Sequence, residues 1–323
     1  MVVCAVHGAA GTGKSTLAVQ AAHRVAERFP DGQLYCDLHG AVAGLAPLGA
    51  REVLWRFLRA FGVHGDGTPR DVDEAAAHLR SVVAGRRVLL VLDNAADAAG
   101  VRPLLPASPG CAALVTSRRM LSTLEGATHL RLSVLPHRQA VELLGRLAGA
   151  GRVRAEPEAA AWIARLCGHL PLALRTAGAR LAARPTWPLH ALAERLADPE
   201  TRLDELDFGD LAVRASLEVS YHSLQWGQDP GGRAAARLFR LLGLLDGPEV
   251  SIGVMAALLD WPPAATEAAL ERLVDVHLVE TLGPGRYRIP DLPHLLAREH
   301  ARQLSRTAAP LVDGLLQARP GTP

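Results

Sequence analysis

The sequence predicts an α/β domain built on a parallel sheet, followed by an all-α domain and a third domain of helices and a β-hairpin. Three observations support this prediction. A glycine-rich loop lies between a short apolar segment and an amphipathic stretch near the start of the chain, an uninterrupted apolar run ends in Asp93, and helical stretches with proline starts follow residue 133. The 323 residues are enough for two or three domains.

Composition favours packed helices and argues against several protein classes. Hydrophobic residues make up 49% of the chain and aromatic residues 4%, so the cores depend on Leu, Ala and Val. A formal net charge of +2 is too small to indicate a nucleic-acid surface. No apolar run reaches the length of a membrane span, no signal peptide is visible, and the cysteines lack disulfide or CxxC spacing. We therefore expect a cytoplasmic protein with no membrane partner, whose reduced thiols are Cys4, Cys36, Cys111 and Cys167.

The loop His7–Thr16 has the pattern G-x-x-x-x-G-K-[ST] of a P-loop. Val2–Val6 predicts a strand before the loop, and the stretch after Lys14 has helical periodicity. Glycines let successive backbone N–H groups face an anion, and the N-terminus of the following helix adds positive potential. The pattern predicts binding of ATP or ADP with Mg²⁺, with the Ser15 hydroxyl on the metal. The expected phosphate-binding residues are Gly8, Gly11, Thr12, Gly13, Lys14, Ser15 and Thr16.

Lys14 is the only lysine in the chain, and all other basic side chains of the Lys/Arg type are arginine. Asn94 is likewise the only asparagine, which is typical of a GC-rich genome that uses arginine wherever a positive charge suffices. Arginine is a planar fork, whereas lysine is a compact charge on a flexible stem. A chance survivor in an exposed turn is the alternative, but the flanking pattern favours a phosphate ligand at this position.

The rest of the sheet is predicted from four short segments. These are Leu34–Leu38, Arg87–Asp93, Ala112–Arg118 and Thr128–Leu132, with helices near Glu52–Phe61 and Val72–Ala84 between the first two. Asp93 is expected at the carboxyl edge, where open α/β sheets bind ligands, and could hold Mg²⁺ through water. Taken alone, Asp93 could equally be a helix N-cap, but the P-loop upstream favours the metal role.

Arg118 ends the fourth expected strand. In P-loop folds with an added strand between the two Walker strands, the residue ending that strand points at the γ-phosphate, so Arg118 is placed to sense it. A surface arginine beside Arg119 is an equally open interpretation. The expected catalytic residues are thus Lys14, Asp93 and Arg118.

With these motifs the chain resembles the NB-ARC type of STAND nucleotide-switch proteins, most closely the nucleotide-binding module of large actinomycete antibiotic-regulatory (SARP) transcription activators. The P-loop is one of the motifs that match the family. The matching motifs follow the family's order along nearly the whole chain. The others are Phe29–Gly40, Val88–Asp97, Leu114–Arg119, Gly168–Leu174, Ser220–Leu224 and Arg286–Ala301.

The resemblance implies an AAA+-like ASCE P-loop domain over 1–132, a helical domain over 133–208, a winged-helix domain over 209–304 and a C-terminal tail over 305–323. The residues support the second and third domains. Helical stretches with proline or polar starts are Pro136–Leu147, Pro157–Cys167, Pro171–Ala183 and Pro188–Ala197. From about Leu211 we expect three helices and then a hairpin of Leu278–Glu280 and Arg286–Ile289, which is a winged-helix order.

Two more nucleotide ligands are implied by the resemblance. Pro171 matches the GLPL proline that packs against adenine, although by itself it is a helix N1 proline, and both roles are compatible. Asp291 ends Ile289-Pro290-Asp291, which stands where the family has an MHD triplet. Because Pro290 has no side-chain donor for the diphosphate, the hold on ADP is expected to be weaker, with Asp291 left as a possible helix cap.

A second departure concerns hydrolysis. ATPases of this class usually follow the magnesium aspartate with another acid that orients the attacking water, and here that position is Asn94. General-base assistance is typically worth about 10²–10⁴-fold, so hydrolysis is expected to be slow unless Asp97 or another acid substitutes.

The third domain is not expected to contact DNA. Its likeliest recognition stretch, Ala264–Val276, carries three acids and the single basic residue Arg272, and an acidic face repels phosphate.

The sequence therefore predicts a regulatory switch, at most a slow ATPase, that self-associates in its ATP state and works with other domains of a larger regulator. Because Met1 stands directly before the first strand, we expect an excised or naturally short module. Two alternatives stay open: a P-loop ATPase or phosphotransferase acting on a separate substrate, and a scaffold that holds ADP permanently.

Overall fold

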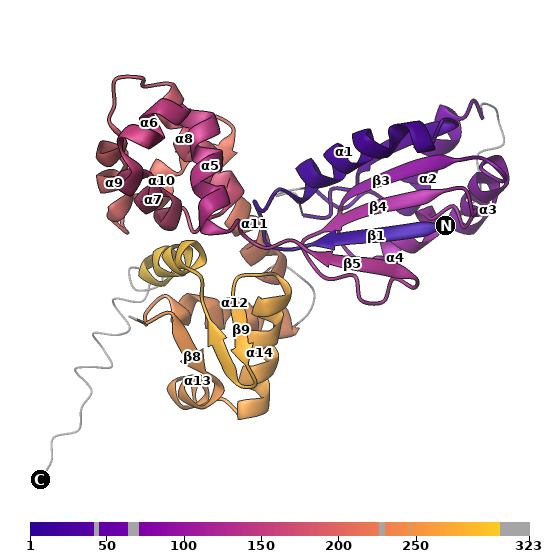
Figure 1. Ribbon diagram of the computed structural model, residues 1–323. Coiled ribbons are helices and arrows are strands. Elements are labelled where there is room, and N and C mark those ends of the chain that lie inside the picture. The colour runs from indigo at the N-terminus through magenta and orange to yellow at the C-terminus, as the bar shows by residue number, and fades with distance from the viewer. Residues whose placement is uncertain (42–44, 64–70, 226–229, 246, 304–323) are drawn as a thin grey trace, which may run out of the picture. The chain divides into compact units, whose positions relative to one another are not determined.

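The computed structural model describes residues 1–41, 45–63, 71–225, 230–245 and 247–303. These residues form two compact units (Figure 1). Unit 1 consists of Met1–Leu135 with the short segments Leu170–Leu172 and Asp275–His277, and unit 2 is the rest of the described chain. The predicted tail over 305–323 lies outside the described residues.

A five-stranded sheet is the centre of unit 1, with the strand order β2-β3-β4-β1-β5. All four neighbouring pairs are parallel, as expected for strands connected by crossovers. The five predicted strands are confirmed. They are β1 (Val2–His7), β2 (Gly32–Asp37), β3 (Val88–Ala95), β4 (Ala112–Ser117) and β5 (Ala127–Arg131).

Helices cover both faces of this sheet. On one face α1 (Lys14–Val25) buries Ala18 against Leu89 and Val91 of β3. The other face carries the larger apolar core. It is covered by α2 (Ala50–Ala60), α3 (Val72–Val82) and α4 (Ala98–Val101), and the short helices η1 (Ala26–Arg28) and η2 (Arg102–Leu104) complete the unit.

Strand β3 explains why the sheet could be predicted. Val88 to Leu92 are all buried, which is the continuous apolar pattern of a parallel strand covered on both faces. The strand runs two residues past its predicted end at Asp93, to Ala95. Asn94 has a φ of 56°, and the β3–β4 register shifts between Leu92 and Ala95, so the strand bulges at this point. Asparagine tolerates this left-handed conformation better than most side chains.

Unit 2 begins with an all-helical part. The four predicted helices are confirmed to within one residue at each end, and two short helices were not predicted. The series is α5 (His137–Ala148), α6 (Ala150–Ala155), α7 (Pro157–Leu166), α8 (Pro171–Ala182), α9 (Leu189–Ala197) and α10 (Arg202–Glu205). α6 follows α5 after the single residue Gly149, whose φ of 104° breaks the helix.

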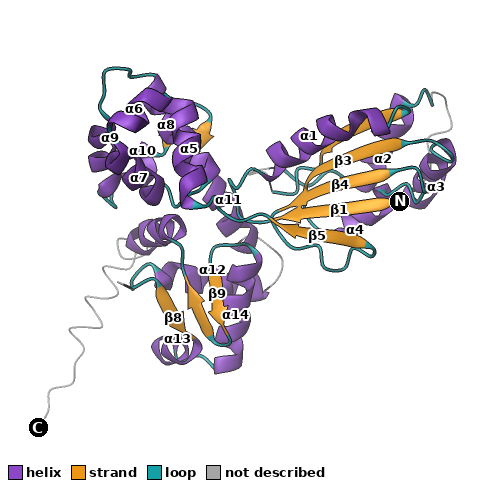
Figure 2. Cartoon of the chain, in the orientation of Figure 1, coloured by secondary structure: helices purple, strands orange, loops and turns teal. Residues whose placement is uncertain are grey.

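The later part of unit 2 combines helices with a three-stranded antiparallel sheet of order β8-β10-β9 (Figure 2). Four helices are present where three were predicted, and β8 is an additional strand. The hairpin begins at Glu280 because the Leu278 and Val279 N–H groups both donate to the Leu273 oxygen near the end of the preceding helix. The elements are β6 (Asp207–Phe208), β7 (Leu211–Ala212), α11 (Val213–Gln225), α12 (Pro230–Leu242), β8 (Glu249–Ser251), α13 (Ile252–Leu259), α14 (Pro263–Asp275), β9 (Glu280–Gly283) and β10 (Arg286–Arg288). Residues 291–303 are also helical.

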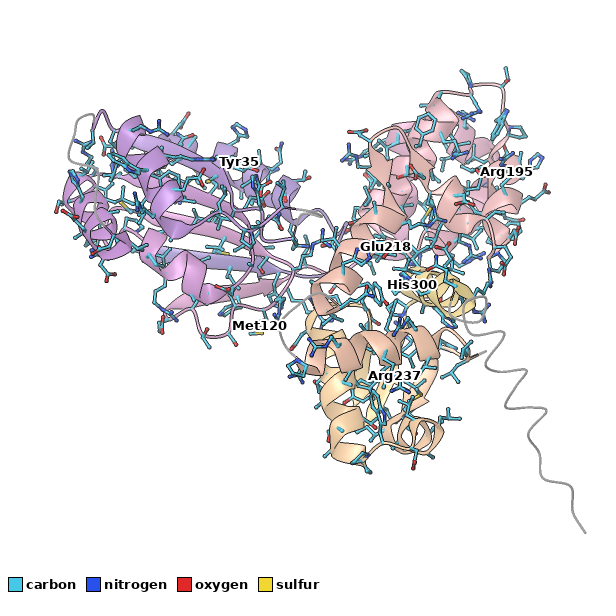
Figure 3. All side chains as sticks on the ribbon, turned by 180° about the vertical axis from the view of Figure 1, so that it is seen from behind. Tyr35, Met120, Arg195, Glu218, Arg237 and His300 are labelled. Atoms are coloured by element: carbon cyan, nitrogen blue, oxygen red, sulfur yellow. The ribbon has the colours of Figure 1, made fainter. Side chains whose placement is uncertain are left out.

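Several ionisable side chains form hydrogen-bonded pairs inside unit 2. Glu205 of α10 is 8% exposed and accepts hydrogen bonds from Arg180 at 2.7 Å and from Arg195 at 2.6 Å. Arg195 lies on α9 and His300 lies beside Glu218 of α11, with 3.2 Å between the His300 Nε2 and a Glu218 carboxylate oxygen (Figure 3). Within the described ranges, none of the helices combines the length and the apolar character needed to span a membrane.

Candidate functional site

The glycine-rich loop connects the end of β1 to the first turn of α1. Gly8, Gly11 and Gly13 have φ values of 152°, 78° and 91°, which side chains other than glycine rarely adopt. At Gly8 a β-carbon would lie 2.2 Å from the backbone oxygen of Leu132, so no larger residue fits without moving the chain. Gly13 is the N-cap of α1, and the helix therefore begins directly at Lys14.

The Lys14 side chain extends back over the glycine-rich loop that precedes it. Its Nζ donates hydrogen bonds of 2.8 Å to the carbonyl oxygens of both Gly8 and Ala9. The Thr12 hydroxyl donates to the same Ala9 oxygen at 2.9 Å, which closes the loop around these contacts. Ser15 and Thr16 are exposed at the first turn of α1, where backbone N–H groups have no partner inside the helix.

Lys14, Asp93 and Arg118 come together at the carboxyl edge of the sheet, although they lie far apart in the sequence. Burial and, to a smaller extent, the positive charge of Arg118 lower the pKa of Lys14 to about 8, and the negative charge of Asp93 partly opposes them. Burial also lowers the pKa of Arg118 to about 10, and the side chain stays charged at neutral pH. The edge therefore presents two cations and one carboxylate beside a helix N-terminus, which is a setting that attracts phosphate.

The lowered pKa of Lys14 makes a pH-dependent prediction. An anion beside the ammonium group would raise its pKa again, so binding favours the protonated form. The affinity gained from Lys14 is fully present below the free-state pKa of about 8 and is lost as the pH rises above it. We expect ATP affinity to fall by about tenfold between pH 7 and pH 9, measured by calorimetric titration at constant Mg²⁺. An affinity that stays constant across this range would contradict the prediction.

Asp93 is 5% exposed, and hydroxyl groups hold both of its carboxylate oxygens. Thr116 of β4 donates to Oδ1, and Tyr35 of β2 donates to Oδ2 at 3.1 Å (Figure 3 labels Tyr35). Burial and the neighbouring Asp93 raise the pKa of the Tyr35 phenol to about 12. Asp93 does not cap a helix in this structure. The N-cap of the helix that follows β3, α4, is Asp97, whose Oδ1 accepts the Gly100 N–H at 2.8 Å.

The oxygen donors present fit a magnesium ion that is held largely by water and phosphate. Asp93 supplies a carboxylate at the sheet edge, and Ser15 supplies an exposed hydroxyl at the start of α1. In the described part of the chain no group of three or more His, Cys, Asp or Glu side chains could enclose a metal ion. Mg²⁺ does not need such a cage, because it usually keeps several waters and binds through one or two protein oxygens and substrate phosphates.

Asn94 occupies the sequence position of the second acid, and its hydrogen bonds connect it to the neighbouring strands and to Gly40. Its backbone N–H donates to the Thr116 hydroxyl at 2.9 Å, and its carbonyl accepts the Gly40 N–H at 2.7 Å. The side-chain amide donates to Oδ1 of Asp37 at 3.4 Å. Asp37 ends β2 and was not singled out from the sequence. The signal that could have identified it is its position as the acid that ends the strand paired with β3.

The remaining predicted residues are divided between the two units. Pro171 is the first residue of α8 and lies in the segment Leu170–Leu172 of unit 1, where the Leu172 N–H donates to the Gly11 oxygen at 3.0 Å. Asp291 is in unit 2 at the start of the helical residues 291–303. Burial lowers the pKa of Arg202, and the charge of Asp291 is the main opposing influence.

The comparisons with known proteins agree with this geometry. Residues 2–134 match the protein family described as an AAA domain. The regulatory protein AfsR of Streptomyces griseus is 51% identical over 303 residues, which are 94% of this chain and 30% of that protein. AfsR of Streptomyces coelicolor is 50% identical over 306 residues, with 95% and 30% covered. The chain therefore spans less than a third of the length of these relatives.

Two solved structures share the fold at low sequence identity. A Walker-type ATPase of Pyrococcus abyssi has a TM-score of 0.56 at 15% identity, over 92% of this chain and 91% of that one. The ORC2 protein of Aeropyrum pernix, described as ADPNP and ADP complexes, has a TM-score of 0.52 at 15% identity, over 95% and 89%. Residues 2–134 thus have the parallel-sheet fold of a P-loop domain and match the AAA domain family, in a chain that is about 50% identical over most of its length to regulatory proteins.

Proposed function

We propose that unit 1 binds ATP and ADP with Mg²⁺ and that the bound nucleotide controls the state of a larger regulator. The observation that carries this proposal is the meeting of Lys14, Asp93 and Arg118 beside the glycine loop, with Arg118 and Asp93 close enough to influence the pKa of Lys14. A site that concentrates positive charge at a helix N-terminus is suited to a polyphosphate.

Each part of the site has a distinct role in this proposal. The loop N–H groups hold the phosphates, and Lys14 exchanges its bonds to the Gly8 and Ala9 oxygens for bonds to phosphate oxygens. Arg118 responds to the γ-phosphate, and Pro171, which the Leu172–Gly11 hydrogen bond keeps near the loop, packs against adenine. The Ser15 hydroxyl would hold Mg²⁺ directly and Asp93 would hold it through water, and the ion would neutralise phosphate charge.

The regulatory part of the proposal draws on the NB-ARC and STAND resemblance and on the AfsR relatives. We assign 133–208 to a helical domain and 209–304 to a winged-helix domain, whose Asp291 helps to stabilise the ADP-bound state. ATP favours an open, self-associating state, and further domains of a longer cytoplasmic regulator read out the change. A nucleotide can shift such an equilibrium only by its difference in affinity for the two states.

The test compares ATP with ADP on the purified chain in the presence of Mg²⁺. We expect different affinities and a larger sedimentation coefficient with ATP, because the two nucleotides stabilise different states. Equal affinities together with identical sedimentation would contradict the switch. Turnover near the enzyme median of about 10 s⁻¹ would instead favour an ATPase or phosphotransferase with a separate substrate.

A further inference from the structure

A second carboxylate lies beside Asp93 at the sheet edge. Asp37 is the last residue of β2, and its Cα pairs with that of Asp93 in the β2–β3 register. Side chains paired in this way lie on the same face of the sheet, so both carboxylates share the face that carries α1. The negative charge of Asp37 is among the causes that raise the pKa of Tyr35, after burial and Asp93, which places Asp37 close to the Tyr35–Asp93 hydrogen bond.

The hydrogen bonds of Asp37 orient its carboxylate and leave one oxygen available. Oδ1 accepts the His39 backbone N–H at 2.8 Å and the Asn94 side-chain amide at 3.4 Å. Among the described residues no hydrogen bond reaches Oδ2, and the side chain is partly exposed. Two N–H donors on one oxygen fix the plane of the carboxylate, and the second oxygen can accept a proton from water.

The other acid considered for this role is occupied elsewhere. Asp97 is exposed and caps α4 through Oδ1. Asn94 follows Asp93 directly, but an amide cannot accept a proton, and here it donates to Asp37. At the position directly after the magnesium aspartate, Asn94 therefore helps to orient an acid on the neighbouring strand, Asp37.

We propose that Asp37 is the catalytic carboxylate that orients and deprotonates the attacking water in ATP hydrolysis. This inference rests on the proposed binding of ATP at the P-loop. The water oxygen forms a bond to the γ-phosphorus while the bond from that phosphorus to the β–γ bridging oxygen breaks. ADP leaves with the electron pair, the water proton passes to Oδ2 of Asp37, and the products are ADP and inorganic phosphate.

The test is single-turnover hydrolysis of radiolabelled ATP by the Asp37→Asn variant. Asparagine keeps the acceptor oxygen for the His39 N–H, so the turn after β2 is retained. We expect ATP affinity within threefold of wild type and a hydrolysis rate lower by about 10²–10⁴-fold, because only the proton acceptor is removed. The matched control is Asp97→Asn, which keeps the helix cap and should hydrolyse at the wild-type rate.

The outcomes separate this inference from the proposal on which it rests. An Asp37→Asn variant that binds ATP and hydrolyses it within threefold of wild type overturns the role of Asp37, and so does an equal loss in Asp97→Asn. Wild-type protein that binds ATP but does not hydrolyse it overturns the role as well. Wild-type protein that binds no ATP overturns the proposed nucleotide site itself, and the inference with it.

Discussion

Replacement of Lys14 by alanine is expected to weaken the binding of ATP and ADP by about 100-fold. The variant removes an ammonium group that lies within 2.8 Å of two loop oxygens and is positioned to bridge phosphates. A hydrogen bond to a charged group contributes about 1.5–3 kcal/mol. Two bonds from the ammonium group to phosphate, each contributing about half of that amount, account for the expected loss of affinity. Calorimetric titration with each nucleotide in the presence of Mg²⁺ measures the effect.

Two further variants sharpen this prediction. Lys14→Arg restores the charge with the side chain that the chain uses at every other Lys/Arg position, and we expect binding to remain impaired because a planar fork does not fit the same point between two oxygens. Arg24→Ala removes an exposed cation from the same helix and should bind like wild type. Wild-type affinity in Lys14→Ala, or an equal loss in Arg24→Ala, would show that the lysine is not a phosphate ligand.

Replacement of Glu205 by alanine is expected to destabilise unit 2 by about 3 kcal/mol. The carboxylate is 8% exposed and pairs with Arg180, whose side chain is 12% exposed, and with the half-exposed Arg195. Loss of the carboxylate leaves the buried Arg180 with only the backbone oxygens of Asp204 and Asp207 as acceptors. Removal of one partner from a buried pair typically costs about 3–5 kcal/mol, and these remaining contacts and the exposure of Arg195 place the expected value at the lower end. Urea denaturation followed by tryptophan fluorescence measures the free energy of unfolding.

The matched control for Glu205 is Glu142, which also pairs with an arginine at 2.7 Å. Its partner Arg146 lies one helical turn away on α5, and the two side chains are 56% and 75% exposed. An exposed pair of this kind contributes about 0.3–0.5 kcal/mol, so Glu142→Ala should be nearly neutral. Similar losses for the two variants would mean that burial does not determine the contribution of the Glu205 pairs.

The sheet and the loop were predictable because local patterns determine them. The apolar run of β3 is long enough to specify a buried strand, and the P-loop spacing fixes both the strand before it and the helix after it. The five strands and the helices α2, α3, α5, α7, α8 and α9 therefore appear close to their expected limits. The short helix α6 and the strand β8 were missed, since single turns and three-residue strands carry little periodic signal.

The contacts around Asp93 were not predictable because they depend on strand register. Tyr35 and Asp93 lie on different strands, and only their pairing in the sheet brings the phenol to the carboxylate. The same holds for Asp37, which becomes a candidate catalytic residue once Asn94 is seen to donate to it. From the sequence, Asn94 could be identified only as an amide at a position where an acid is usual. The structure shows that its backbone is left-handed and that its side chain donates to Asp37.

The assignment of the glycine loop and Lys14 as a nucleotide site is tested most directly by calorimetric titration of the wild-type chain with ATP and with ADP in the presence of Mg²⁺. We expect saturable binding of both nucleotides in the micromolar range, about −8 kcal/mol, with affinities that differ between the two. The absence of binding heat for both nucleotides, in protein whose melting temperature neither nucleotide changes, would contradict it.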